Sequence, residues 1–143
     1  MSWAQKALND FKIKSLDLDR LLSLEEIEDD EETPFLASLI QIYLTDTPKT
    51  VERLRSAIKG EQLHVIKQAS HVLKSSSFNI GATRLAKMAE ALEVKIADNP
   101  NTDVIQINKV FHEIEAEFSA VIRDLGVIQK LVVQAGKPIP EKD

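Results

Sequence analysis

Residues 70–82, SHVLKSSSFNIGA, contain a histidine and a lysine three positions apart, followed by three serines. A neutral imidazole nitrogen is a nucleophile, and a nearby ammonium group can stabilise a phosphoryl group that the ring accepts. His71 and Lys74 are therefore candidates for phosphoryl chemistry, and the alternative is an ordinary exposed histidine near a lysine on a supporting helix. Lys67 lies about one helical turn before His71 and Lys74 about one turn after it, so each is a candidate for the electrostatic role.

The helix that must carry these residues extends from about residue 61 to 77. At about 100° per residue, the side that must face the core carries Leu63, Ile66, Ala69, Ser70 and Leu73. The opposite side carries His64, Lys67, Gln68, His71, Lys74 and Ser75. We therefore expect His71 to be exposed in the middle of a helix, among polar neighbours.

Ser75, Ser76 and Ser77 are unusual in such a helix, because serine hydroxyls compete for backbone hydrogen bonds. In one interpretation, the small side chain at Ser75 lets another protein approach the imidazole. In the other, the serines belong to a fraying helix end before Asn79 and Gly81. The residues alone leave both interpretations open.

Amphipathic spacing predicts helices along the whole chain and gives no strand signal. Thr33-Pro34 and Thr47-Pro48 are each typical of an N-cap followed by proline at the first helical position. They predict two separate helices, the second ending at Gly60. The expected helices follow the apolar residues of 16–22, 35–46, 48–59, 61–77, 85–96 and 107–133.

Helices joined by short turns indicate an all-α protein built as an antiparallel helical bundle. Residues 1–14 predict an extra helical arm, with a docking or dimer contact as the alternative role for Trp3. Residues 127–143 complete the last helix and form a polar tail. The acidic run EEIEDDEE at 25–32 is interpreted as a solvated loop rather than a cation site.

The composition excludes several classes of protein. A net charge of −5 argues against general affinity for nucleic acid or acidic membranes, and the lack of cysteine excludes disulfides and thiolate metal sites. The sequence has no apolar run of membrane-spanning length, no signal-peptide core and no glycine-rich phosphate loop. We expect a cytoplasmic, free-standing protein that is not a kinase.

The segment SHVLKSSSFNIGATRLAKMAEALE closely resembles the active helix and following turn of histidine-containing phosphotransfer (HPt) domains. In that family a histidine is followed by any residue, then leucine, lysine, glycine, small residues, an apolar residue, glycine and alanine. The matching positions here are His71, Leu73, Lys74, Ser75, Ser76, Ser77, Ile80, Gly81 and Ala82, and Leu85 and Leu92-Glu93 match the next helix. The similarity covers about residues 15–125 and implies an antiparallel four-helix bundle over residues 15–126.

The resemblance implies a phosphorelay carrier of two-component signal transduction, without ATP binding or kinase activity of its own. His71 would accept a phosphoryl group from a receiver-domain aspartate and pass it to another receiver. The implied partners are response-regulator receiver domains and a hybrid sensor kinase, with the carrier itself a monomer. Magnesium would belong to the receiver, so no cofactor or metal is expected in this chain.

The resemblance also implies roles for the neighbours of His71. Lys74 would neutralise charge on the phosphoryl group, with Lys67 second, and Gln68 would hydrogen-bond to that group or to the partner's backbone. The residues expected to form the docking face around His71 are His64, Ser70, Ser75 and Gly81.

Ser75 departs from the family pattern, which usually has glycine at this position. The serine would either hydrogen-bond to a phosphoryl oxygen or hinder some receivers. It also leaves open an alternative function, a helical adaptor that docks receivers without accepting phosphate. Metal binding by His64 and His71 is disfavoured, because two helical turns separate them by about 10 Å.

Overall fold

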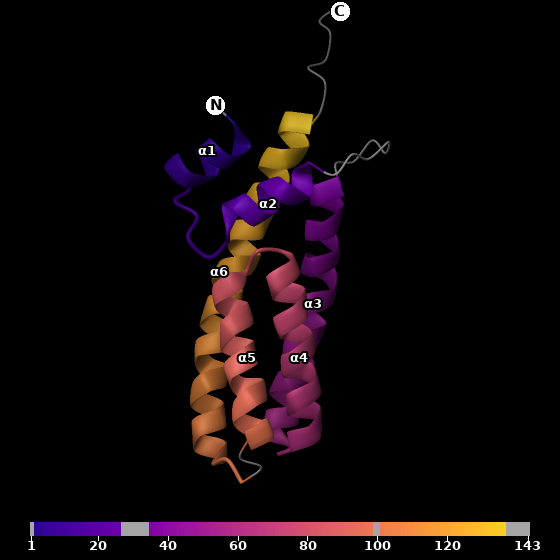
Figure 1. Cartoon of the computed structure of the whole chain (residues 1–143), viewed down its shortest axis with the longest axis vertical. Coiled ribbons are helices and arrows are strands. Elements are labelled where there is room, and N and C mark those ends of the chain that lie inside the picture. Colours follow the sequence, from indigo (N-terminus) through magenta and orange to yellow (C-terminus); the bar gives the residue numbers. More distant parts are fainter. Residues whose placement is uncertain (1, 27–34, 99–100, 137–143) are drawn as a thin grey trace, which may run out of the picture.

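Six helices and no strand make up the described part of the chain, which in this computed structural model comprises residues 2–26, 35–98 and 101–136. The all-α class predicted from the sequence is confirmed. Figure 1 shows the helices in chain order, α1 (Trp3–Asn9), α2 (Leu18–Glu25), α3 (Phe35–Lys59), α4 (Leu63–Asn79), α5 (Thr83–Asp98) and α6 (Val104–Gly136).

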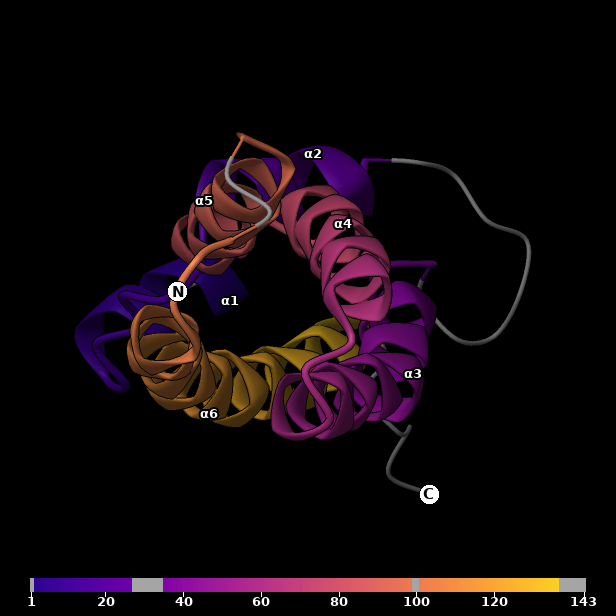
Figure 2. The same ribbon diagram turned by 90° about the horizontal axis from the view of Figure 1, so that it is seen from below.

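Helices α3 to α6 form the predicted antiparallel four-helix bundle. Seen along the bundle in Figure 2, each helix packs against two neighbours, in the cyclic order α3, α4, α5 and α6. Short turns at residues 60–62 and 80–82 join α3 to α4 and α4 to α5. Such turns force consecutive helices to run antiparallel, so α4 and α5 form a hairpin along one side of the bundle.

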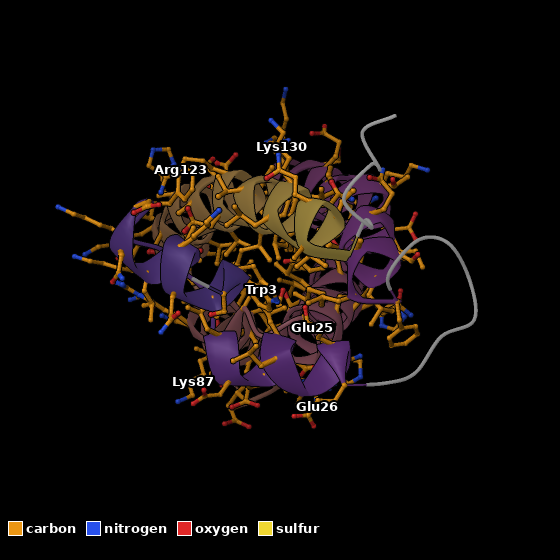
Figure 3. All side chains as sticks on the ribbon, turned by 90° about the horizontal axis from the view of Figure 1, so that it is seen from above. Trp3, Glu25, Glu26, Lys87, Arg123 and Lys130 are labelled. Carbon is orange, nitrogen blue, oxygen red and sulfur yellow. The ribbon has the colours of Figure 1, made fainter. Side chains whose placement is uncertain are left out.

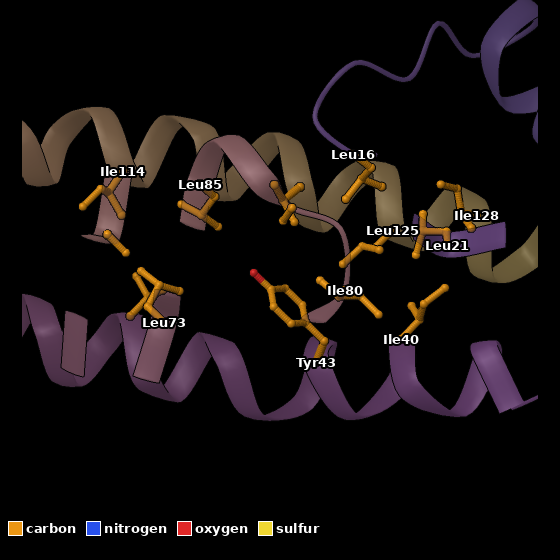
Figure 4. Packing of buried hydrophobic residues seen from close by; sticks show 14 of the residues in the cluster. Leu16, Leu21, Ile40, Tyr43, Leu73, Ile80, Leu85, Ile114, Leu125 and Ile128 are labelled. Carbon is orange, nitrogen blue, oxygen red and sulfur yellow. The ribbon is translucent and has the colours of Figure 1, made fainter. Parts of the chain in front are cut away.

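The core of the bundle is built from the apolar face of each helix. Leu73 of α4, Leu85 of α5 and Ile114 of α6 are fully buried and lie close together in Figure 4, while the equally buried Ile40 of α3 points toward Leu21 and Ile128 farther along the core. Each such side chain contributes about 2 kcal/mol by leaving water. Burial of Leu73 fixes the rotation of α4 about its axis, and this rotation determines which residues of α4 face solvent.

Helix α3 differs from the prediction of two helices, because it continues without a break through Pro48. An internal proline removes one backbone hydrogen bond and costs about 3 kcal/mol. The buried stripe of Tyr43, Thr47, Val51 and Leu54 nevertheless continues at helical spacing across Pro48. The helix persists because packing of this stripe outweighs the cost of the proline.

The N-terminal helices close one end of the bundle. Helix α1 packs against α6 and α2 against α3, and the Trp3 indole Nε1–H donates a hydrogen bond to the Glu25 carboxylate between α1 and α2 (Figure 3). Trp3 is buried, so its ring is not available as a surface contact. In the part of the chain described here, no helix is both long and apolar enough to span a membrane.

Several features predicted from the sequence lie outside the described residues. They are the Thr33-Pro34 start signal, most of the acidic run at 25–32, residues 99–100 of the break before α6, and the tail at 137–143.

Candidate functional site

His71 lies in the middle of α4, on the face turned away from Leu73, and 59% of its side chain is exposed. Its imidazole Nδ1 is 2.6 Å from the Oε2 atom of Glu93 on the neighbouring helix α5. The other oxygen of this carboxylate, Oε1, accepts a hydrogen bond from the Lys74 ammonium group at 2.9 Å. One carboxylate therefore holds both residues that the sequence singled out for phosphoryl chemistry.

Glu93 is the least exposed member of this group, with 15% of its side chain accessible. Burial alone would raise the pKa of Glu93, but the hydrogen bonds from Lys74 and His71 outweigh burial and lower that pKa below its usual value. Glu93 is therefore ionised near neutral pH. An ionised carboxylate accepts hydrogen bonds and cannot donate them, so the proton between the two groups belongs to Nδ1.

The consequence for His71 concerns its second ring nitrogen. When the imidazole is neutral and Nδ1 carries the proton, Nε2 keeps a free lone pair. No contact to Nε2 occurs among the described residues, and the ring is largely exposed. In this neutral form of the ring, Nε2 is an accessible nucleophile. The hydrogen bond between Nδ1 and Glu93 fixes the orientation of the imidazole.

A shallow surface groove surrounds His71 and carries positive charge. Its lining includes Arg53 from α3 together with His64, Lys67 and Gln68 from α4. The Arg53 guanidinium donates a hydrogen bond from Nη2 to the Gln68 side-chain oxygen at 3.0 Å. Predicted site residues His64, Lys67, Gln68, His71 and Lys74 thus share one face of the bundle, where cations are in excess although the whole chain has a net charge of −5.

Two predicted docking residues do not lie on this surface. Ser70 is fully buried, and its hydroxyl donates to the Ile66 carbonyl oxygen at 2.7 Å, so it satisfies its polar group within α4. Gly81 is buried in the α4–α5 turn with a φ of +82°, where an added Cβ would come within 3.0 Å of the Asp17 carbonyl oxygen. Because neither residue is accessible, the expectation that they contact a partner is corrected.

The serines at the end of α4 differ in their surroundings. Helix α4 continues to Asn79, so the interpretation of a fraying end at Ser75 is wrong. Ser77 is buried and its hydroxyl lies 2.9 Å from the Tyr43 hydroxyl on α3, while burial raises the pKa of Tyr43 to about 12. Ser75 is exposed one turn after His71.

Glu93 and Arg53 were missed as site residues in the sequence. Glu93 lies about as far after the turn at Gly81 as His71 lies before it, so an antiparallel hairpin brings the two side chains together. The similar distance of the two residues from Gly81 could therefore have identified Glu93 from the sequence. Arg53 had no comparable signal, because its approach to Gln68 depends on the lateral fit of α3 against α4.

A comparison with known protein families identifies the family of this helical bundle. Residues 38–124 match the family model described as the Hpt domain. The chain belongs to the Hpt domain family. The matched region of this chain includes His71, Lys74 and Glu93. The match therefore supports the resemblance seen around His71 in the sequence.

Two curated relatives of this Hpt domain have names that describe them as phosphorelay proteins. Over 70 residues the chain is 30% identical to multistep phosphorelay regulator 1 of Schizosaccharomyces pombe, a match covering 49% of this chain and 24% of that protein. Over 65 residues it is 25% identical to phosphorelay intermediate protein YPD1 of Candida albicans, covering 46% of this chain and 35% of that protein. The matches therefore span about a quarter and a third of the relatives' lengths.

A solved structure supports the fold of this Hpt domain. Histidine-containing phosphotransfer protein B (HptB) of Pseudomonas aeruginosa PAO1 superposes with a TM-score of 0.63, covering 85% of this chain and 94% of HptB. At 21% identity this similarity concerns the fold alone, and it supports the helical-bundle arrangement.

Proposed function

We propose that this Hpt domain is a phosphorelay carrier in which His71 Nε2 accepts a phosphoryl group from a receiver-domain aspartyl phosphate. The same nitrogen then passes the group to the aspartate of a second receiver. The observation that carries this proposal is the contact between Glu93 and His71 Nδ1, because it holds the proton of the neutral ring on Nδ1 and leaves the lone pair of Nε2 free on a largely exposed side chain. Membership of the Hpt family makes phosphoryl transfer the matching chemistry.

The transfer step needs no proton movement in this arrangement. As the Nε2 lone pair forms the N–P bond, the P–O bond of the aspartyl phosphate breaks and the receiver aspartate leaves as a carboxylate. The ring then carries positive charge, which the Glu93 carboxylate stabilises through the proton that stays on Nδ1. The return step reverses these bonds, so a carrier with this site can both accept and donate.

Charge on the moving phosphoryl group requires donors around Nε2. Lys74 is one turn from His71 but is held by Glu93, with 21% of its side chain exposed, so it orders the carboxylate and supplies positive charge nearby. Lys67 and Gln68 are exposed on the other side of His71 and can reach a bound phosphoryl group. We assign all three to stabilisation of the phosphoryl group.

Docking of the receiver would use the surface of α3 and α4 that begins at Ser76, more than one helical turn along α4 from His71. An apolar groove lies there, and Ile42 at its rim is 56% exposed. The groove is also lined by Leu39, Tyr43, Ser76 and Ile80, together with the polar side chains of Asp46, Thr47 and Asn79. We propose that a receiver-domain helix occupies this groove, and that His64 and the small Ser75 border the contact around His71 itself. The receiver must also leave, so we expect a weak and transient interface.

The chain acts in this proposal as a carrier that neither binds ATP nor phosphorylates itself. A kinase would need a nucleotide site, and the sequence has no glycine-rich phosphate loop. The phosphoryl group must therefore come from a partner, either a free response-regulator receiver or the receiver of a hybrid sensor kinase.

Transfer from a panel of radiolabelled phospho-receivers tests this function. Wild type and His112→Gln should take up label, whereas His71→Gln should not. His112→Gln is the matched control, since His112 is an exposed histidine on α6 outside the groove around His71. Binding of receivers without labelling of the wild type would instead favour the adaptor function that Ser75 leaves open.

A further inference from the structure

Arg53 reaches from α3 to the site on α4, and among the described residues its one hydrogen bond to the site is to Gln68. Its Nη2 group donates to the Oε1 atom of Gln68 at 3.0 Å, and Gln68 lies three residues before His71 on the same face. All three side chains line one groove. The hydrogen bond therefore links a residue outside the active helix to a neighbour of the phosphoryl acceptor.

The direction of this hydrogen bond determines what Gln68 presents to the groove. A glutamine amide has an acceptor oxygen at one end and a donor NH2 group at the other. Because a guanidinium can only donate, Arg53 must hold the oxygen, and the NH2 group is turned away from Arg53. We propose that Arg53 is a positioning residue that aims the Gln68 NH2 group at the phosphoryl group on His71, an inference that rests on the proposed carrier function.

The chemistry explains why the orientation matters. Phosphoryl oxygens are acceptors, so the Gln68 NH2 group stabilises them whereas its carbonyl oxygen repels them. Without Arg53, an exposed amide can turn either end toward His71. Arginine remains protonated throughout the accessible pH range, so the amide is held in one orientation whatever the charge state of His71. Lys67, Lys74 and Glu93 also face this groove or its border, but none has a hydrogen bond to Gln68 among the described residues.

Single-turnover transfer from a phospho-receiver, measured over a range of receiver concentrations, tests this role. Arg53→Ala and Gln68→Ala should each lower the maximal transfer rate by about three- to tenfold, the loss expected for one solvent-exposed hydrogen bond. The half-saturating receiver concentration should change little. The double variant should be no slower than Gln68→Ala alone, because Arg53 acts through Gln68.

A charge control separates positioning from simple attraction of an acidic partner. Lys49→Ala removes a cation from an exposed position one turn before Arg53 on α3, and its maximal rate should equal that of the wild type. Arg53→Lys, which keeps the charge and a hydrogen-bond donor, should have a maximal transfer rate between those of Arg53→Ala and the wild type. Thermal unfolding followed by circular dichroism should be unchanged in all these variants, since Arg53, Gln68 and Lys49 are exposed.

The outcomes distinguish this inference from the proposed function. Independent losses that multiply in the double variant would overturn the inference, as would a raised half-saturating concentration with an unchanged maximal rate. Wild-type transfer by Arg53→Ala would also overturn it while leaving the carrier function intact. Failure of the wild type to accept label from any receiver would instead remove the function on which the inference rests.

Discussion

Replacing Glu93 by glutamine removes the shared acceptor behind the phosphoryl-accepting histidine. In the wild type the two carboxylate oxygens accept from His71 at 2.6 Å and from Lys74 at 2.9 Å. A glutamine side chain has nearly the same shape but only one oxygen, so one of the two donors loses its acceptor. The negative charge that stabilises the ring after phosphoryl transfer is lost as well.

The size of the effect follows from the geometry of the site. A hydrogen bond to a charged group contributes about 1.5–3 kcal/mol when buried. His71 is 59% exposed, so water replaces part of the interaction, and we expect a loss of about 1 kcal/mol. A barrier higher by about 1 kcal/mol slows transfer about fivefold.

The assay is single-turnover transfer from a saturating phospho-receiver, with Glu90→Gln as the matched control. Glu90 is an exposed glutamate one turn earlier on α5, so the control removes the same charge without touching His71. Nitrogen-15 NMR of the imidazole gives a second readout, since the neutral wild-type ring should carry its proton on Nδ1. Transfer by Glu93→Gln at the wild-type rate would contradict this role of Glu93, as would equal slowing of transfer by Glu90→Gln.

Three further predictions concern stability, measured as the free energy of unfolding in urea. Gly81→Ala should lose at least about 1–2 kcal/mol, because its φ of +82° and the nearby Asp17 carbonyl oxygen disfavour a Cβ, and an unchanged value would contradict the described turn. Tyr43→Phe should lose about 1 kcal/mol with its buried hydrogen bond to Ser77; equal stability would mean that this bond is not formed. The stability advantage of the wild type over Glu93→Gln should be present at pH 7 and shrink as the pH falls below the usual carboxyl pKa, because the folded-state pKa of Glu93 is lowered. An advantage that grows in acid would contradict that direction.

The placement of His71 could be predicted from the sequence because helical periodicity is a local property. Leu73 and Ile66 had to face the core, and that requirement turned His71 outward, as the structure confirms. The same periodicity explains the bundle, since each helix has one apolar face. Spacing also placed Ser70 on the core side, where its hydroxyl is satisfied within the helix rather than by a partner.

The remaining features depend on tertiary contacts that spacing does not encode. Pro48 carried a strong local start signal, yet the buried stripe through Thr47 and Val51 kept α3 continuous. The contact of Arg53 with Gln68 required knowing how α3 lies against α4. Glu93 was an intermediate case, because the position of the turn at Gly81 predicts which residues of α4 and α5 face each other.

The measurement that tests the central claim most directly is the position of phosphorus on the His71 ring. After transfer from a phospho-receiver, combined nitrogen-15 and phosphorus-31 NMR identifies which ring nitrogen is bonded to phosphorus. The contact of Glu93 with Nδ1 predicts phosphorylation at Nε2, with the proton retained on Nδ1. Phosphorus on Nδ1, or on a residue other than His71, would contradict the account.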